Sequence, residues 1–214
     1  MIKPSIGQRS PELKLAGFLK QKDQDVCLVY DMPQTNEELV EGLLDKVIDP
    51  YGKDYTEKTL VINIRSQISS IHKNFDTLFE RTFSEAINLH SRCPKMVMGE
   101  VYMIAIPEYD SNSANEKQLG YKTLDPRLVE KYIKSFNSVN DRTDVNGELY
   151  KYEAVALLIV DFTGETPVLF NTTEELIQAG YLLAETTVSY ESLTWSNFSE
   201  RLISKYNSRF HANV

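Results

Sequence analysis

Polar side chains that could act on a substrate follow one short strand-like run in the 214-residue sequence. In the run "LVINIRSQ", which ends at Gln67, the polar side chains of Asn63, Arg65 and Gln67 occupy every second position, and Leu60, Ile62 and Ile64 occupy the positions of the other face. Because neighbouring side chains of a strand point to opposite faces, a strand places these three on one face. This polar face could form part of a site, and ordinary solvation of the strand is the alternative.

The segment that follows, residues 69–90, is predicted to be a helix with a crowded polar face. Its apolar residues recur at helical spacing from Ile71 to Ala86, while Lys73 and Glu80 fall on the opposite side. This polar face is either a solvated surface or one wall of a site, and both interpretations stay open on the spacing alone.

Carboxylates near strand ends are the remaining candidates for chemistry. Asp25 begins a strand-like run, and Glu80 lies in the helix that the Arg65 strand precedes. Mg²⁺ prefers one or two carboxylates together with water, and hydrolysis of a phosphodiester also needs a cation near the scissile phosphate. Asp25, Glu80 and Arg65 would meet this need if the fold brought them together. In the alternative, Arg65 pairs with a nearby acid such as Glu57.

Glu100 is unusual because it lies inside the long apolar run of residues 95–109. A carboxylate in such a strand must be paired or must face a cavity. It could stand beside the same cleft, but the preferred interpretation is a bond to Lys95 or a half-exposed edge.

Several classes of function are excluded by motifs that the sequence lacks. It has no glycine-rich phosphate loop and no GxSxG, HExxH or CxxC motif, and its three histidines form no cluster. These absences argue against dinucleotide binding, P-loop chemistry, zinc ligation and serine hydrolysis. The net charge of -8 argues against non-specific coating of nucleic acid, although a local basic cleft is compatible with it.

The compartment is predicted from the cysteines and from the apolar segments. Cys27 and Cys93 lack metal-ligand spacing and are interpreted as buried free thiols, which indicates a reducing compartment. The first residues contain no apolar core of a signal peptide, and the longest apolar runs are too short to cross a bilayer as helices. We therefore expect a soluble, cytoplasmic protein without a membrane partner.

The order of predicted elements indicates an α/β fold. Strands and helices alternate along the chain around one mixed β-sheet, and no break in composition divides it, so residues 1–214 are predicted to form a single domain. The predicted strands are 25–32, 59–65, 95–109, 152–162 and an edge strand at 186–193. The predicted helices are 35–48, 69–90, 125–136, 172–182 and 194–210, the last with Thr194 as its cap.

The block around Arg65 resembles the catalytic core of the PD-(D/E)XK superfamily, in particular the type II restriction endonucleases. In that superfamily an Asp on one strand precedes a (D/E)-x-K motif on the next, and a helix packs behind. The corresponding residues here are Asp25, then Asn63-Ile64-Arg65, which Ser66 and Gln67 follow. The useful part of the resemblance spans residues 12–107 and implies a restriction-endonuclease-like sheet flanked by helices.

The resemblance implies a Mg²⁺-dependent endonuclease that hydrolyses phosphodiester bonds in double-stranded DNA. Asp25 and Glu80 would hold the metal ion, and Arg65 would stabilise charge on the phosphate. A symmetric DNA site also implies a homodimer. The DNA backbone would contact the polar residues of the strand end and the helix, which are Gln67, Lys73, Asn74 and Arg81.

Two positions differ from the motif and define the alternative function. Asn63 replaces the acid and offers only a neutral oxygen, and Arg65 replaces the lysine with a cation of different geometry. If Glu80 does not supply the second carboxylate, the chain is a catalytically inactive or altered relative that binds DNA or a protein partner. A third possibility is an acidic interaction protein with no role in nucleic-acid binding.

Overall fold

The protein is one α/β domain built on a mixed six-stranded sheet. The computed structural model describes residues 2–3, 12–29, 34–40, 42–115 and 119–211. The strand order is β1-β4-β7-β8-β11-β12, in which β7, β8 and β11 are parallel and the remaining pairs are antiparallel. These strands are β1 (Ile2–Lys3), β4 (Val26–Leu28), β7 (Leu60–Gln67), β8 (Val97–Ala105), β11 (Ala154–Asp161) and β12 (Val168–Leu169).

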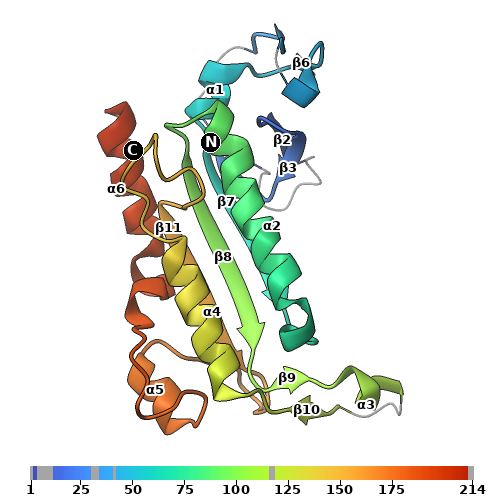
Figure 1. The fold of residues 1–214 in the computed structure, drawn as a ribbon, viewed down its shortest axis with the longest axis vertical. Coiled ribbons are helices and arrows are strands. Elements are labelled where there is room, and N and C mark those ends of the chain that lie inside the picture. Colours follow the sequence, from blue (N-terminus) through green and yellow to red (C-terminus); the bar gives the residue numbers. More distant parts are fainter. Residues whose placement is uncertain (1, 4–11, 30–33, 41, 116–118, 212–214) are drawn as a thin grey trace.

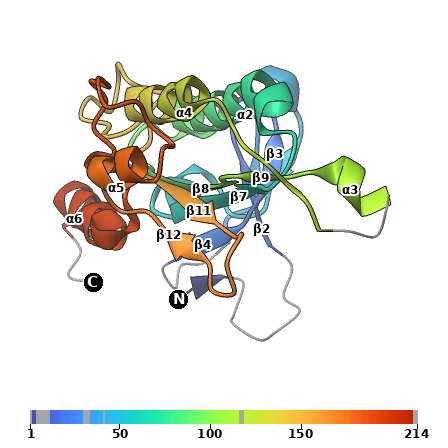
Figure 2. The same cartoon turned by 90° about the horizontal axis from the view of Figure 1, so that it is seen from below.

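Helices cover both faces of the sheet. One face lies under α2 (Ile71–Arg92) and α4 (Pro126–Ser138), which run side by side over β7, β8 and β11 (Figures 1 and 2). The other face is covered in part by α6 (Phe198–Phe210), whose Phe198, Leu202 and Tyr206 pack on Val97, Val101 and neighbouring strand residues. In the chain, α5 (Thr173–Gln178) and two 3-10 turns, η2 (Glu191–Leu193) and η3 (Trp195–Asn197), come between α4 and α6.

Short elements surround this core. A hairpin of β2 (Leu13–Ala16) and β3 (Gln21–Gln24) lies beside α2, and β5 (Glu37–Glu38) pairs with β6 (Ile48–Asp49) around the 3-10 turn η1 (Gly42–Leu44). The helix α1 (Lys53–Glu57) leads into β7. A projecting arm is formed by β9 (Glu108–Tyr109), α3 (Ser111–Asn115) and β10 (Tyr121–Lys122) (Figure 1).

Most of the predicted elements are confirmed, with shifted ends, although residues 30–32 of the strand predicted at 25–32 lie outside the described residues. The predicted helix at 35–48 is wrong. That segment forms β5, η1 and β6 because its backbone turns at Gly42 and Lys46, whose φ angles are +70° and +65°. A right-handed helix cannot pass through two residues with positive φ. Consequently Leu39 is buried, but Leu43 is 78 % exposed.

The edge strand predicted at 186–193 is also wrong. The edge position beside β11 is taken by β12, and the predicted segment instead lies against β11 through the buried Tyr190. The Tyr190 hydroxyl donates to the carbonyl of Leu157 at 2.5 Å. Thr194 occupies the N-cap position of η3 rather than that of α6. Its side chain makes no capping hydrogen bond to η3. The N-cap of α6 is Asn197.

The alternation of β7 decides which side chains meet α2. Val61, Asn63 and Gln67 are buried on the α2 side of the sheet, whereas Leu60 and Ile62 pack in the cluster with α6. The prediction that Asn63, Arg65 and Gln67 share one face is confirmed. That face lies beneath a helix, rather than pointing off an edge of the sheet.

Candidate active site

A cluster of ionic side chains is centred on Arg65 of β7. The guanidinium donates from Nη1 to Glu100 Oε1 on β8 at 2.5 Å and to Thr82 Oγ1 on α2 at 3.0 Å. Nη2 donates to Glu85 Oε2, one turn further along α2. The strand and the helix therefore meet through one cation and two carboxylates, and only 17 % of the Arg65 side chain is exposed.

A second cation reaches the cluster from the β2–β3 hairpin. Lys22 Nζ pairs with Glu85 Oε1, so the two carboxylate oxygens of Glu85 bind two different cations. Asn88 fixes the hairpin to α2: its Oδ1 accepts from the backbone N–H of Leu19 at 2.7 Å and of Lys20 at 3.2 Å. The position of Lys22 thus depends on the docking of this hairpin against the helix.

Asp25 supplies the third carboxylate, immediately before β4. Its Oδ2 accepts from the backbone N–H of Ile64 at 2.7 Å, which fixes the aspartate beside β7. Its negative charge favours the charged forms of both Lys22 and Arg65, although it is a minor influence on each. Asp25 and Arg65, two of the residues predicted from the sequence, therefore lie in one cluster.

Burial sets the protonation behaviour of these groups. Burial raises the pKa of the Glu100 carboxyl to about 7, although Arg65 and Lys22 oppose the shift. Burial, with a smaller effect of Arg65, lowers the pKa of Lys22 to about 8. Burial also disfavours the charged form of Arg65, but the combined effects of Glu100, Tyr152 and Asp25 outweigh it, and the pKa of the guanidinium is raised. Arg65 is a fixed cation, whereas Glu100 and Lys22 are closer to neutrality.

Two buried polar atoms in the cluster are left without partners. Asn63 Nδ2 and Glu100 Oε2 make no hydrogen bond within the part of the chain that the structure describes. The two residues lie opposite each other in the register of β7 and β8. Burial raises the pKa of Glu100, and the facing Asn63 amide opposes that rise as a hydrogen-bond donor, so the two groups are placed to satisfy each other.

Glu80, which was predicted to hold the metal ion, lies outside the Arg65 cluster. It is exposed on the outer surface of α2, and within the described residues no ion pair or hydrogen bond joins its carboxylate to Asp25 or Arg65. Glu85 is five positions after Glu80, a rotation of roughly 140° around a helix. Glu85 therefore faces the sheet, whereas Glu80 faces away from it.

The four residues predicted to contact DNA divide into one buried and three exposed. Gln67 is buried; its Nε2 donates to the Ser70 carbonyl, and its Oε1 accepts from the hydroxyls of Tyr102 and Tyr132. Its amide is thus bonded within the core. Lys73, Asn74 and Arg81 are exposed on α2. Arg81 precedes Glu85 by one helical turn, which places it at the rim of the cluster.

Sequence reasoning missed Lys22 and Glu85 and preferred the wrong partner for Glu100. Glu100 is fully buried on Arg65, and neither Lys95 nor a half-exposed edge explains it. Arg65 pairs with Glu85 and Glu100 rather than with Glu57. A usable signal for Glu85 existed, because its position lies on the apolar stripe of α2 between Thr82 and Leu89.

A second buried ionic group has a structural role. The carboxylate of Glu153 accepts from the N–H of Met98 at 2.6 Å and from Arg142 at 3.2 Å, and pairs with Arg209 of α6 at 2.7 Å. Burial lowers the pKa of the adjacent His90 to about 3, so this imidazole is neutral. These bonds fasten α6 and the segment before β11 to the start of β8.

The capacity of the Arg65 cluster for a metal ion is limited. Within the described residues no group of three or more His, Cys, Asp or Glu side chains is arranged to hold a metal ion. Mg²⁺ does not require three, since it commonly takes one or two carboxylates and completes its shell with water and substrate phosphate. Asp25 and Glu100, which lie beside β7 on its two neighbouring strands, would be the two carboxylates of that smaller set.

Comparisons with known proteins leave the family open: no family model, curated protein or solved structure matches this chain. Among the described residues, no helix is long and apolar enough to cross a membrane.

Proposed function

We propose that this protein is a Mg²⁺-dependent DNA endonuclease of restriction type, which hydrolyses phosphodiester bonds in double-stranded DNA. The observation that supports this proposal is the convergence of Asp25, Glu85 and Glu100 with Lys22 and Arg65. Acidic oxygens for a cation, next to cations for a phosphate, are what metal-assisted hydrolysis of a phosphodiester requires.

The arrangement of elements supports a restriction-endonuclease-like version of the α/β fold. Asp25 adjoins β4, which pairs antiparallel with β7, and β7 contains Asn63-Ile64-Arg65. The helix α2 follows β7 and packs behind it. An aspartate beside one strand, the motif on the neighbouring strand and a helix behind are the three parts of the resemblance described from the sequence.

In this proposal Asp25 and Glu100 hold the metal ion, and Glu100 takes the part that was expected of Glu80. Glu100 lies opposite Asn63 in the register of the sheet, so its carboxylate stands near the position where the motif has an acid. A bound Mg²⁺ would supply an activated water and neutralise phosphate charge. Glu85 positions Lys22 and Arg65 through its two oxygens.

The remaining polar groups would position the DNA. Lys22, with a third of its side chain exposed (32 %), is the more accessible of the two cations and would approach a phosphate oxygen. Arg81, Asn74 and Lys73 are exposed on α2 and would contact the backbone without reading its sequence. A symmetric DNA site would be bound by a homodimer.

One observation favours the alternative of a catalytically inactive relative that binds DNA or a protein partner. Arg65 pairs with both glutamates, so in this arrangement the cation and the acids neutralise one another. Such a closed ion network satisfies its own charges without a ligand, and Asn63 in place of an acid is consistent with it.

Cleavage of supercoiled plasmid in Mg²⁺ tests the proposal. Wild type should nick or linearise the plasmid, and Asp25→Asn and Glu100→Gln should each lose at least 100-fold in rate. Glu80→Gln is the matched control, an exposed glutamate that should retain activity. Full activity in both Asp25→Asn and Glu100→Gln would refute the assigned site. DNA retention that weakens with salt, without cleavage by wild type, would support the inactive relative instead.

A further inference from the structure

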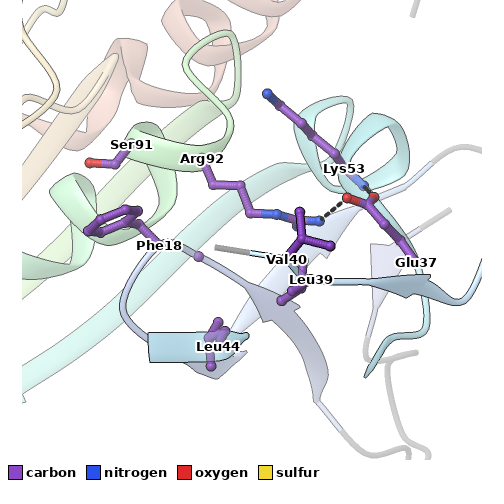
Figure 3. Close-up of a pocket in the computed structure, with 9 residues that line it drawn as sticks. Phe18, Glu37, Leu39, Val40, Leu44, Lys53, Ser91 and Arg92 are labelled. Atoms are coloured by element: carbon purple, nitrogen blue, oxygen red, sulfur yellow. Dashed lines mark hydrogen bonds and ion pairs between the residues drawn. The ribbon is translucent and has the colours of Figure 1, made fainter. Parts of the chain in front are cut away.

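A pocket opens where the β2–β3 turn, the β5–η1 segment, the start of α1 and the end of α2 meet (Figure 3). Its volume is about 230 Å³. Sites for drug-sized ligands are larger, at roughly 300–1,000 Å³, so this pocket has room for a small metabolite. The lining is partly apolar, from Phe18, Leu39, Val40 and Leu44, and partly polar, from Glu37, Lys53, Ser91 and Arg92.

Contacts with α2 fix the walls of the pocket. The backbone N–H of Phe18 donates to the Asn88 carbonyl at 2.7 Å. Arg92 Nη1 donates to the Ala16 carbonyl at 3.1 Å and pairs with Asp49 of β6 at 2.8 Å. These contacts tie both the β2–β3 hairpin and the β5–β6 pair to the helix. The pocket is therefore formed before any ligand binds, as is usual for sites of small molecules.

One arm of the Arg92 guanidinium lacks a hydrogen bond. Only 10 % of this side chain is exposed. Nη2 lies 3.3 Å from Glu37 Oε1, but this contact is not a hydrogen bond, and Nη2 has no hydrogen-bond partner among the described residues. Since buried N–H groups are nearly always satisfied, this arm of Arg92 is available to an acceptor that a ligand supplies.

Glu37 covers this arm of Arg92 and is itself partly free. Its side chain is 40 % exposed, and its Oε2 accepts from the backbone N–H of Lys53 at 2.6 Å. The Lys53 side chain extends away from Glu37 and Arg92 (Figure 3). Asp49, which is fully buried, already balances the charge of Arg92. The pocket therefore presents an unsatisfied donor and, beside it, a carboxylate whose charge is incompletely balanced.

We propose that this pocket binds a free apolar α-amino acid of the size of leucine. The carboxylate of the ligand accepts from Arg92 Nη2, and its ammonium pairs with Glu37. The Glu37 carboxylate thus exchanges Arg92 for the ammonium, and no charge is left without a partner. A zwitterion has no net charge, so it avoids the repulsion that Glu37 and Asp49 exert on a simple anion.

The apolar part of the lining selects a ligand with an apolar side chain. Phe18 is half exposed at 50 %, and Leu39 is buried at 8 % exposure. A side chain that lies on these residues and on Val40 removes apolar surface from water, which favours binding in proportion to the area covered. Glycine, which has both charged groups but no side chain, should therefore bind more weakly than leucine.

Isothermal titration calorimetry with leucine, without DNA or Mg²⁺, tests this site. Wild type should bind leucine at least about tenfold more tightly than glycine, isocaproate or isoamylamine. These analogues lack the side chain, the ammonium and the carboxylate, respectively. Absence of leucine binding at millimolar concentrations would overturn the proposal. Equal affinity for leucine and isocaproate would also overturn it, because the pocket would then recognise an anion alone.

Glu37→Gln should lower the affinity for leucine at least about tenfold, because the ammonium loses its charged partner. The same variant should bind isocaproate more tightly than wild type does, because a repelling carboxylate has been removed. Glu38→Gln, which changes the next and exposed glutamate of β5, is the matched control and should bind both compounds as wild type does. Leucine affinity that Glu37→Gln leaves unchanged would place any binding outside this pocket.

Two exposed apolar residues give a second matched pair. Val40 lines the pocket and is 76 % exposed, whereas Leu43 is outside the lining and 78 % exposed. Val40→Asp should abolish leucine binding and Leu43→Asp should retain it, both with an unchanged melting temperature. Equal affinities of the two variants would contradict the assigned apolar lining. None of these measurements uses DNA cleavage, so this proposal and the nuclease proposal can fail separately.

Discussion

Arg65 of β7 donates to Glu100 of β8 at 2.5 Å, and this pair joins two parallel strands at the centre of the candidate site. Glu85 of α2 completes the arrangement from the helix above, again through Arg65. The guanidinium of this β7 residue therefore contacts both the neighbouring strand and the covering helix. Its removal should affect both stability and activity.

Replacing Arg65 by alanine should destabilise the protein by about 3–5 kcal/mol, because two buried carboxylates lose their common partner. Arg65→Lys should recover part of this loss, since it restores a charge but not the two-armed geometry. Urea unfolding followed by circular dichroism measures the effect. Arg81→Ala, which removes an exposed arginine from α2, should change stability by no more than about 0.5 kcal/mol. Equal effects of Arg65→Ala and Arg81→Ala would contradict the central role of Arg65.

Glu100 should make stability depend on pH. Its pKa is raised from 4.5 to about 7 in the fold, so protonated Glu100 favours the native state. The corresponding stability is fully present below pH 4.5 and is lost as the pH rises through 7. The Glu100→Gln variant has no carboxyl group at this position and cannot titrate there. Relative to wild type, the variant should therefore gain stability between these pH values, on the order of 1 kcal/mol per pH unit.

Melting temperatures of wild type and Glu100→Gln, recorded in matched buffers from pH 4.5 to 8, test this expectation. The quantity of interest is the difference between the two proteins at each pH, because other titrating groups cancel in it. A difference that stays constant across this range would show that Glu100 does not titrate in the fold.

The β2–β3 hairpin should detach when its anchor on α2 is removed. Asn88→Ala loses the side-chain bonds to Leu19 and Lys20 and should cost about 1–3 kcal/mol. Gly17→Ala should have a comparable effect, because a Cβ there would lie 2.6 Å from the Asn88 carbonyl oxygen. Hydrogen exchange should show faster exchange in residues 13–24 while β7 and β8 stay protected. Asn74→Ala, an exposed asparagine on the same helix, is the control and should leave the hairpin protected.

Metal binding should be detectable without catalysis. If Asp25 and Glu100 hold Mg²⁺, the ion should raise the melting temperature of wild type by mass action. The increase should disappear in Asp25→Asn and persist in Glu80→Gln. No Mg²⁺-dependent increase in wild type, even at millimolar concentrations, would favour the inactive relative. Ca²⁺, which has similar oxygen ligands, is a useful second probe.

The sequence determined the elements with strong periodicity and the side chains that share a face. The two-residue period of β7 placed Asn63, Arg65 and Gln67 together, and the helical period of α2 separated Lys73 and Glu80 from the apolar stripe. Both results follow from local backbone geometry, which neighbours in sequence specify. The same reasoning failed for residues 35–48, where the spacing of leucines suits a helix but Gly42 and Lys46 take positive φ angles.

Only the tertiary structure decided which acids meet Arg65. Glu85 and Glu100 lie 20 and 35 positions away in the chain, and they reach Arg65 because α2 crosses back over β7 and returns the chain to the neighbouring parallel strand. Lys22 joins from a hairpin that Asn88 docks onto the helix. Periodicity shows that Glu80 and Glu85 face different directions. Which side of α2 faces the sheet depends on how the whole core packs. That packing places Glu85, and not Glu80, against Arg65.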